Sequence, residues 1–244
     1  MAKVASRSTR IWVDEHALTG YLNAADLKID QETVKVDTFS STGPERVVGN
    51  YDHSISFGGF FDGADDAFDE MAYVDLQTDE DHQAFLAFAG VTEGSVGYEQ
   101  PVRFKSQPRS SKVGAAVLLN LEAEGSGPVA RANILRSAAV TGTGDGTGQN
   151  LGATTSGQIF VVTYRVLSVS GAGNIVLQCH ESSDNGGGDA YASIAALASG
   201  TLTGVGVTRK TTTAATEAYK RISVATFSGF TSVTILVTAG VAVG

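Results

Sequence analysis

The side chains in this chain that are most capable of chemistry are its histidines, its single cysteine and a few polar clusters. The segment 180–184 ("HESSD") brings His, Glu, Ser and Asp together. A Ser-His-Asp triad is assembled from separate segments of a fold, so closeness along the chain is no evidence for one. The histidines lie far apart in sequence and match no metal motif of the His-x-x-Glu-His kind. They are His16, His53, His82 and His180.

Two further segments invite a ligand interpretation. The acidic run 62–70 ("DGADDAFDE") lacks the Asp-x-Asp-x-Asp-Gly spacing with a distal Glu that a calcium loop requires. The glycine run 142–148 leads into a strand-like segment, whereas a phosphate-binding loop leads into a helix. Cys179 alternates with Ile175 and Leu177, which predicts a buried strand thiol. The sequence therefore predicts a protein that is not an enzyme, with no metal site and no cofactor.

The composition is typical of a folded β protein. Of the 244 residues, 42% are hydrophobic and 18% are charged, which favours a packed core over disorder. Twenty-nine glycines without a collagen-like repeat predict frequent turns and bulges. Neither a signal peptide nor a membrane span is expected, because no long apolar stretch is present. Synthesis in a cytoplasm is the expectation.

The negative charge is concentrated in the first part of the chain. Residues 1–150 carry 22 acidic and 12 basic side chains, a net charge of −10, whereas residues 151–244 have a net charge of +1. No Lys or Arg lies between Arg46 and Arg103, although that interval holds twelve carboxylates. Nucleic-acid binding needs the opposite sign of charge. We predict an acidic surface that DNA can pass without adsorbing.

Strand signals dominate the first 140 residues. Strands are predicted at 18–29, 34–38, 53–61, 101–107 and 112–127, with apolar and polar residues alternating at 34–38 and 53–61 and the longest apolar run of the chain at 112–127. Residues 40–50 contain glycine, proline and asparagine and are expected to form a loop, and Gly58–Gly59 predicts a bulge or bend. A helix is predicted over 78–90, with Thr78 as N-cap, acidic residues in the first turn and Gly90 at its end. A shorter helix is predicted over 65–73.

The last ninety residues indicate a second β domain. A Gly/Thr-rich stretch precedes them, and short strands with turn signals follow at 159–169, 174–182, 205–212, 218–226 and 232–241. We therefore predict a first domain over 1–140, a linker or long loop over 141–157, and a C-terminal β-sandwich-like domain over 158–244.

The segment 17–62, which includes "GYLNAADL", "VDTFSSTGPERVVG" and "SISFGGFFD", resembles the N-terminal part of the major tail tube proteins of long-tailed, siphovirus-like bacteriophages. The resemblance covers roughly residues 10–135. It implies a mainly β fold: a tail-tube-type β-sandwich or barrel-forming domain with one flanking helix, followed by a second β-sandwich-like domain.

The resemblance also implies a function in assembly. Subunits of this family close into rings, commonly homohexameric, which stack into a tube through which genome DNA is ejected into the host. A trimeric ring of two-domain subunits with pseudo-sixfold symmetry is the alternative. The implied location is the virion tail after synthesis in the host cytoplasm, without contact with a membrane. The implied partners are other copies, the tape measure protein, and the tail terminator and tip proteins; DNA passes without specific binding.

Particular residues receive roles from this resemblance. The inter-ring loop corresponds to residues 39–51, where Glu45 and Arg46 would form ion pairs between rings. Four further apolar residues are candidates for the core or for contacts between subunits. They are Ile55, Phe57, Phe60 and Phe61.

Two other classes of protein fit the composition. A capsid-decorating or head–tail joining virion protein would share the β-rich, cysteine-poor sequence, but it would form no open tubes. A carbohydrate-binding adhesion module is suggested by the C-terminal strands. Sugar platforms favour exposed Trp and Tyr, however, and residues 158–244 contain no Trp and only Tyr164, Tyr191 and Tyr219.

Overall fold

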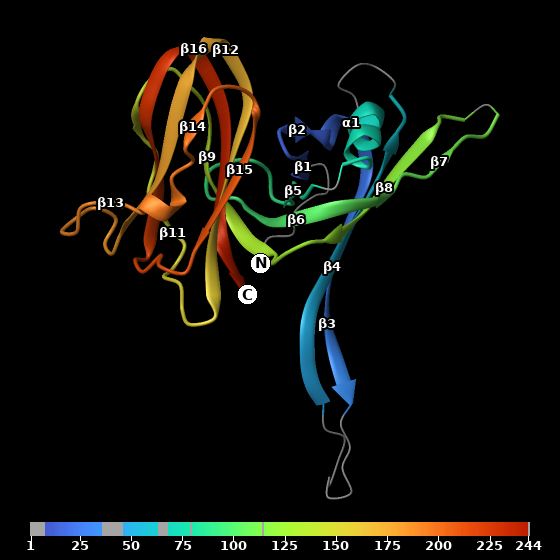
Figure 1. The fold of residues 1–244 in the computed structure, drawn as a ribbon, viewed down its shortest axis with the longest axis horizontal. Helices are drawn as coiled ribbons and strands as arrows, with labels where there is room; N and C mark the ends of the chain where they lie inside the picture. Colours follow the sequence, from blue (N-terminus) through green and yellow to red (C-terminus); the bar gives the residue numbers. More distant parts are fainter. Residues whose placement is uncertain (1–7, 36–45, 63–67, 79, 114, 244) are drawn as a thin grey trace, which may run out of the picture. The chain divides into compact units, whose positions relative to one another are not determined.

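The computed structural model describes residues 8–35, 46–62, 68–78, 80–113 and 115–243. The chain is mostly β, as predicted (Figure 1). Glu45, one of the two predicted inter-ring residues, lies outside the described residues. Within those residues, no helix has the length and apolar character needed to cross a membrane.

The contacts within the chain group its residues into two compact units. Unit 1 comprises Met1–Thr19, His82–Gln100 and Val129–Gly244, and unit 2 comprises Gly20–Asp81 and Pro101–Pro128. This division differs from the predicted boundaries at 140 and 158. The predicted linker belongs to unit 1, because its short strands β10 (Gly144–Asp145) and β11 (Gln149–Asn150) pair with a later strand, β16 (Tyr219–Val243).

Unit 1 is built around two long antiparallel strands. β12 (Gln158–Ser182) and β16 (Tyr219–Val243) pair from one end to the other, from Gln158 opposite Val243 to Ser182 opposite Tyr219. Each was predicted as two separate strands. The register shifts near Gly171, and both Gly171 and Gly229 have positive φ angles of 89° and 79°. Glycine at these positions therefore lets each strand bend and continue where the sequence predicts a break.

Shorter elements complete unit 1 on either side of these strands. β9 (Ala130–Val140) pairs with the second half of β16, and β15 (Gly206–Thr212) pairs with the first half of β12. The remaining elements add to the edges. They are β1 (Arg10–Val13), β2 (His16–Ala17), η2 (Leu18–Gly20), β5 (His82–Ala87), β13 (Ala192–Ser193), η3 (Ala195–Leu197) and β14 (Thr201–Leu202).

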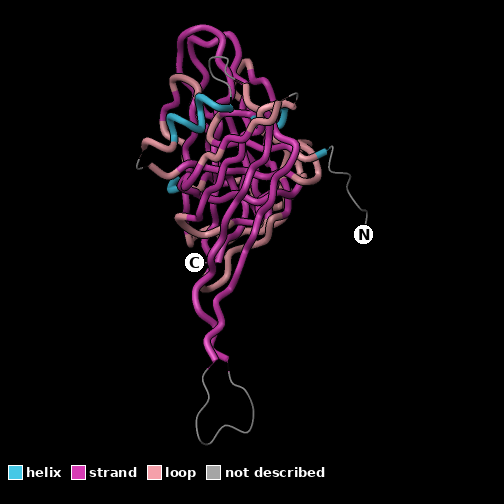
Figure 2. The backbone as a smooth tube through the Cα atoms, turned by 90° about the vertical axis from the view of Figure 1, so that its right-hand side faces the viewer, coloured by secondary structure: helices cyan, strands magenta, loops and turns pink. Residues whose placement is uncertain are grey.

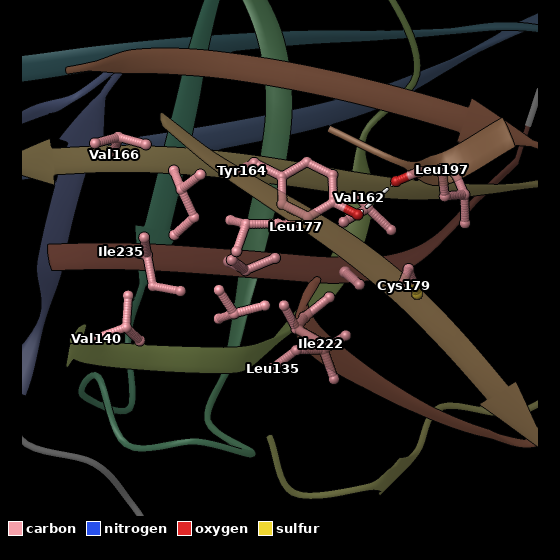
Figure 3. Packing of buried hydrophobic residues seen from close by; sticks show 14 of the residues in the cluster. Leu135, Val140, Val162, Tyr164, Val166, Leu177, Cys179, Leu197, Ile222 and Ile235 are labelled. Atoms are coloured by element: carbon pink, nitrogen blue, oxygen red, sulfur yellow. Dashed lines mark hydrogen bonds between the residues drawn. The ribbon is translucent and has the colours of Figure 1, made fainter. Parts of the chain in front are cut away.

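The main core of unit 1 lies between the two halves of the bent strands (Figure 3). Tyr164 from the first half of β12 and Leu177 from the second half are both fully buried in it. The Tyr164 hydroxyl donates a hydrogen bond to the Leu197 carbonyl at 2.5 Å. Cys179 is fully buried in the same cluster, which confirms the predicted strand thiol. Burial raises the pKa of this thiol to about 12, because it disfavours the thiolate.

A second buried layer of unit 1 contains a charged network. The Arg165 guanidinium, which is fully buried, donates to both carboxylate oxygens of Glu99 at 2.9 and 2.7 Å. It also donates to the backbone carbonyls of Asp14 at 2.8 Å and Gln83 at 3.0 Å. The Thr238 hydroxyl donates to Glu99 at 2.8 Å. These bonds connect β12 and β16 to the segments that carry β1, β5 and β6 (Val96–Ser106), so the network fixes how those strands pack.

The helix predicted over 78–90 is wrong. His82–Ala87 forms β5, in which every residue is buried and which pairs with β1 from Arg10 to Val13. A strand that is buried on both faces shows no alternation, so its apolar run did not distinguish it from a helix. The one α-helix among the described residues is α1 (Phe68–Asp75), close to the shorter helix predicted over 65–73.

Unit 2 contains a smaller antiparallel sheet. Its long strands are β3 (Leu22–Lys35) and β4 (Arg46–Phe60), which pair with each other (Figure 1). β8 (Leu118–Gly125) pairs with β4, with the end of β6 (Val96–Ser106) and with β7 (Arg109–Ser110). Figure 2 shows the same strands from the side, with β3 and β4 continuing as a pair.

Helix α1 is held to unit 2 by polar contacts as well as burial. Met71 and Ala72 are buried, and Asp69 forms an ion pair with Arg109 at 2.6 Å. The Gln107 side-chain amide donates to the Asp69 backbone carbonyl at 3.2 Å. Asp69 lies in the first turn, where a carboxylate also complements the helix dipole.

Candidate assembly surface

The unit 2 sheet has one buried apolar face. Phe57 and Ile55 on β4 are 1% and 2% exposed, and Leu119, Leu121 and Ala123 on β8 are equally buried. Register confirms that they share a face, because Phe57 lies opposite Leu121 and Ile55 opposite Ala123. The alternation predicted for 53–61 is therefore present along β4, and β8, which was predicted only as an apolar strand within 112–127, alternates in the same way.

The other face of the same sheet is polar and exposed. Ser54 and Ser56 on β4 lie opposite Glu124 and Glu122 on β8, and Ser56 also lies opposite Asp26 on β3. Because the central strand β4 carries small side chains on this face, the carboxylates of the flanking strands β3 and β8 are the main charged groups of the face. This face carries five carboxylates and three basic groups, namely Asp26, Asp30, Asp52, Glu122, Glu124, Lys28, Arg103 and Lys105.

Ion pairs on this face link neighbouring positions. Lys105 donates to Glu124 at 2.5 Å, and Lys28 pairs with Asp30. These hydrogen bonds, helped by the charge of the same carboxylates, raise the pKa of Lys105 and of Lys28. Both pairs are exposed, so water screens them and they contribute little to stability. Their effect is to leave the face polar, ordered and net negative.

β3 and β4 continue past the sheet as an arm. β8 pairs with β4 only from Ser54 to Phe60, whereas β3 and β4 pair with each other out to Lys35 and Arg46 (Figure 1). Among the described strands β3 pairs with β4 alone, so its other edge is open. We call residues 29–35 and 46–52 the arm. Residues 46–51 of the predicted inter-ring loop over 39–51 form part of strand β4 and not a loop, and its inter-ring role stays a prediction.

An exposed apolar patch lies at the other end of β4. Phe60 is 48% exposed and lies opposite Leu118, which is 40% exposed. Phe61 and Val117, the next pair along the two strands, are 43% and 39% exposed, and the Phe61 backbone amide donates to the Val117 carbonyl at 3.0 Å. Strand alternation turns these two side chains to the opposite face from Phe60 and Leu118, so apolar side chains are exposed on both faces at this end of β4. Exposed aromatic and aliphatic side chains gathered in this way are typical of interaction surfaces. We call Phe60, Phe61, Val117 and Leu118 the apolar patch.

The predicted contact residues thus fall in different environments. Ile55 and Phe57 are core residues of the folded chain, whereas Phe60 and Phe61 are free to meet another surface. Arg46 is exposed on the arm and donates to the Thr33 hydroxyl at 3.5 Å. Their roles between subunits remain predictions.

The described part of unit 2 has seven other exposed large hydrophobic residues that sequence reasoning did not find, and four of them lie on or next to β4. They are Val117 and Leu118 in the patch and Ile29 and Tyr51 on the arm, the last two being 44% and 57% exposed. The run "AAVLLNL" carried the only signal for Val117 and Leu118: its two adjacent leucines cannot both face the core of a strand.

Gly58 and Gly59 mark an irregularity of the sheet, as predicted. Between them the β3 register shifts, with Leu22 opposite Gly59 and Ala24 opposite Gly58. The extra residue, Asn23, lies on β3. A Cβ atom on Gly59 would approach the Tyr21 carbonyl oxygen to 2.5 Å, so the two backbones can come this close only with glycine there.

No group of three or more His, Cys, Asp or Glu side chains that could hold a metal ion is found within the described ranges. The cluster "HESSD" lies where β12 ends. There Ser182 accepts from and donates to the following turn, and the Ser182 hydroxyl donates to the Asp189 carbonyl at 2.8 Å. These polar residues therefore close a turn.

No family model matches the chain, and no curated protein matches it. Solved structures similar to it include the virion of a native gene transfer agent particle, at 22% identity and a TM-score of 0.44, covering 52% of this chain and 97% of the other. The tail tube of phage SPP1 is similar at 11% identity and a TM-score of 0.43, covering 51% of this chain and 77% of the other.

A third similar structure is the SPP1 Dit protein, described as a hub of the adsorption apparatus. It has 12% identity and a TM-score of 0.36, and covers 96% of this chain and 98% of the other. These structures are of a virion and of phage tail components. Because every TM-score is below 0.5, the function of this chain is argued from its own residues.

Proposed function

We propose that this chain is the structural subunit of a phage-type tail tube, which assembles from copies of itself into stacked rings. The observation that carries the proposal is the two-faced sheet of unit 2. One face is buried against the core, and the other is exposed, polar and rich in carboxylates from Asp26, Glu122 and Glu124. A sheet with this character is suited to line a water-filled channel.

Ring closure follows from the open edge of β3. Among the described strands β3 pairs with β4 alone, and its other edge presents backbone donors and acceptors that pair readily with another strand. If each copy contributes its sheet to a common barrel, every edge is paired and uncontrolled aggregation is prevented. Repeating the same contact around an axis closes a ring, and repeating it along the axis gives a tube. The edge of β3 is therefore the expected site of ring closure.

The charge of the exposed face suits a channel for DNA. The five carboxylates outnumber the three basic groups on this face, so a polyanion is repelled from the wall and does not adsorb to it. DNA would pass without specific binding. In this proposal the protein is located in the virion tail, and the tape measure protein and the tail terminator and tip proteins are its partners.

Electron microscopy of the purified full chain tests the proposal. Rings or tubes with an open channel are expected, and their absence at every protein concentration and salt condition would contradict it. Mass photometry then gives the ring size: six copies of the 25.2-kDa chain weigh about 151 kDa, and three weigh about 76 kDa. We propose six copies, because the described residues of one chain form a single sheet with an arm, so a sixfold ring takes one such sheet from each of six chains.

A charge-reversal variant tests the assignment of the channel wall. Changing Asp26, Glu122 and Glu124 to Lys is expected to make assembled tubes retain DNA at low salt, whereas wild-type tubes release it. Changing Glu217 and Asp189 of unit 1 to Lys is the control and should leave DNA release unchanged. Equal DNA retention by the two variants would show that the polar face of unit 2 does not line the channel.

A further inference from the structure

The turn between β12 and β13 contains an asparagine followed by a glycine, Asn185–Gly186, and both residues are exposed (Figure 1). The backbone nitrogen that follows an asparagine can attack the side-chain amide carbon, and a glycine has no side chain to hinder that approach. The chain has seven asparagines, and each of the other six precedes a residue that carries a side chain. Those six are Asn23, Asn50, Asn120, Asn133, Asn150 and Asn174.

The conformation of the turn requires glycine at position 186. Asn185 and Gly186 have φ angles of 64° and 81°, a left-handed conformation that asparagine and glycine tolerate best. A Cβ atom on Gly186 would also lie 3.2 Å from the Tyr191 ring. The residue that leaves Asn185 open to attack is therefore fixed by the geometry of the turn.

The Asn185 side chain is polarised by a hydrogen bond from a tyrosine. The Tyr191 hydroxyl donates to Asn185 Oδ1 at 2.7 Å. Negative charge develops on this oxygen when a nucleophile adds to the amide carbon, so the donor stabilises the product of the addition. Burial raises the pKa of Tyr191, which keeps its hydroxyl protonated at neutral pH. The Arg221 guanidinium lies 4.1 Å from the centroid of the Tyr191 ring and holds the ring in place.

The Gly186 backbone amide is bonded to a group that can take its proton. It donates to Ser182 Oγ at 2.8 Å, and the Ser182 hydroxyl lies 3.3 Å from Asp184 Oδ1. Hydrogen bonds from the backbone amides of Gly188 and Asp189 lower the pKa of Asp184, which is therefore a carboxylate at neutral pH. A proton that leaves the Gly186 nitrogen thus has a path through Ser182 to a carboxylate.

The leaving group faces no obstacle in the turn. The Asn185 side-chain nitrogen has no hydrogen-bond partner among the described residues, and the residue is exposed, so ammonia would pass directly into water. Nucleophile, polarised carbonyl and leaving group are all present within one short segment.

We infer that Asn185 is a site of spontaneous deamidation through a cyclic imide, promoted by the Tyr191 hydroxyl. The Gly186 nitrogen forms a bond to the Asn185 side-chain carbon, the bond from that carbon to Nδ2 breaks, and Nδ2 leaves as ammonia with the proton that Gly186 has lost. Water then adds to either carbonyl of the imide and opens it to aspartate or isoaspartate. Water is the only co-reactant, and the inference is independent of the proposed tube function.

The reaction changes both the charge and the chain path of the turn. Each event replaces a neutral amide by a carboxylate close to Asp184, whose carboxylate binds the turn from within. In the isoaspartate product the main chain runs through the former side-chain methylene, so the turn becomes longer by one backbone atom. Each copy of the chain therefore gains negative charge at this surface with time after folding.

A time course on the purified full chain tests the inference. The protein is kept at neutral and at mildly alkaline pH, samples are digested with trypsin, and mass spectrometry follows the replacement of amide by carboxylate. The tryptic peptide Val166–Arg209 contains both Asn185 and Asn174, so Asn174, which precedes Ile175, is a reference within the same peptide. Labelling with an isoaspartyl methyltransferase separates isoaspartate from aspartate.

Two variants test the part played by Tyr191. Tyr191→Phe keeps a ring over Arg221 and removes the hydroxyl, whereas the control Tyr98→Phe removes a hydroxyl from β6, where the ring packs edge-on against Phe88. Trp12 fluorescence checks that both variants are folded.

The expected result is conversion of Asn185 to a mixture of aspartate and isoaspartate while Asn174 keeps its amide. Loss of one hydrogen bond to the developing charge should slow the reaction about fivefold in Tyr191→Phe and leave it unchanged in Tyr98→Phe. Conversion of Asn185 no faster than that of Asn174, or conversion without isoaspartate, would overturn the cyclic imide. Reaction of Tyr191→Phe at the wild-type rate would overturn the promotion by Tyr191.

Discussion

Replacement of Glu99 by Leu removes the charge partner of Arg165 at a site that water does not reach. Arg165 is fully buried and Glu99 is 1% exposed. In the variant the guanidinium keeps its bonds to the Asp14 and Gln83 carbonyls but loses both carboxylate bonds. Breaking a buried ion pair on one side costs on the order of 3 to 5 kcal/mol, because the remaining charge is left without compensation.

The reciprocal change, at Arg165, and the double variant together give the free energy of the interaction between Glu99 and Arg165. Arg165→Met leaves the Glu99 carboxylate with only the Thr238 hydroxyl, and a cost of similar size is expected. The double variant removes both charges but leaves the Asp14 carbonyl without its Arg165 donor, whereas the Gln83 carbonyl still accepts from the Asp14 backbone amide at 2.9 Å. An orphaned carbonyl costs on the order of 1 to 3 kcal/mol. The double variant should therefore lose less stability than the sum of the single variants, by more than about 1 kcal/mol.

Urea unfolding followed by tryptophan fluorescence measures these changes. Trp12 is the only tryptophan of the chain, it is 7% exposed, and it stacks on Phe85 with 5.9 Å between ring centroids. Its fluorescence therefore reports unit 1, and measurements at dilute protein keep assembly from adding to stability. Strict additivity of the two single variants would refute direct pairing. A loss below about 1 kcal/mol for Glu99→Leu would refute the buried charge.

Two further predictions concern the other unit and the buried thiol. Phe57→Ala should cost about 3 to 5 kcal/mol by urea unfolding, because the ring is fully buried, whereas Phe60→Ala should cost about 1 kcal/mol or less and act mainly by reducing tube yield in micrographs. The opposite ranking would contradict the placement of the two rings. Because the folded state raises the pKa of Cys179 from 9.0 to about 12, the native chain holds a proton that the unfolded chain releases. The free energy of unfolding should therefore fall between pH 9 and pH 12, by up to about 1.4 kcal/mol per pH unit, and Cys179→Ala should lack that slope. Equal slopes for wild type and variant would contradict it.

Alternation allowed much of the unit 2 sheet to be predicted from sequence. Ile55 and Phe57 share a face two residues apart, and the structure buries both. The error at 78–90 arose because Thr78 and the acidic residues after it have the composition of a helix start, while β5 is buried on both faces. The local sequence at this position favours a helix, whereas burial on both faces favours a strand, and the chain forms the strand.

Long-range pairing explains the errors in unit 1. Gly171 and Gly229 have the signature of turns, but each strand passes through them because the partner strand bends at the same place. The composition of the Gly/Thr-rich stretch 141–157 predicts a linker, and only the pairing of its short strands with β16 shows that it belongs to unit 1. Neither pairing partner can be found from local composition.

For the assembly surface, composition predicted an acidic face and apolar contacts but not which side chains stay exposed. Phe57 and Phe60 have the same chemistry in the sequence, and only the face on which each lies separates a core residue from a patch residue. Along β4 the two rings lie three residues apart and therefore on opposite faces, and the extra residue of the bulge lies on β3 and leaves this parity unchanged.

The position of β16 in its sheet also has a kinetic consequence. The segment Val233–Ala242 lies between β12 and β9 and pairs with both, although it is made after every other strand of unit 1. β9 therefore lacks its β16 partner until about a hundred further residues have been synthesised, and the contacts that complete the sheet join residues far apart in the chain. Such topology makes folding slow. Unit 1 can complete its sheet only after translation of this segment, so a nascent chain on the ribosome remains without its finished core.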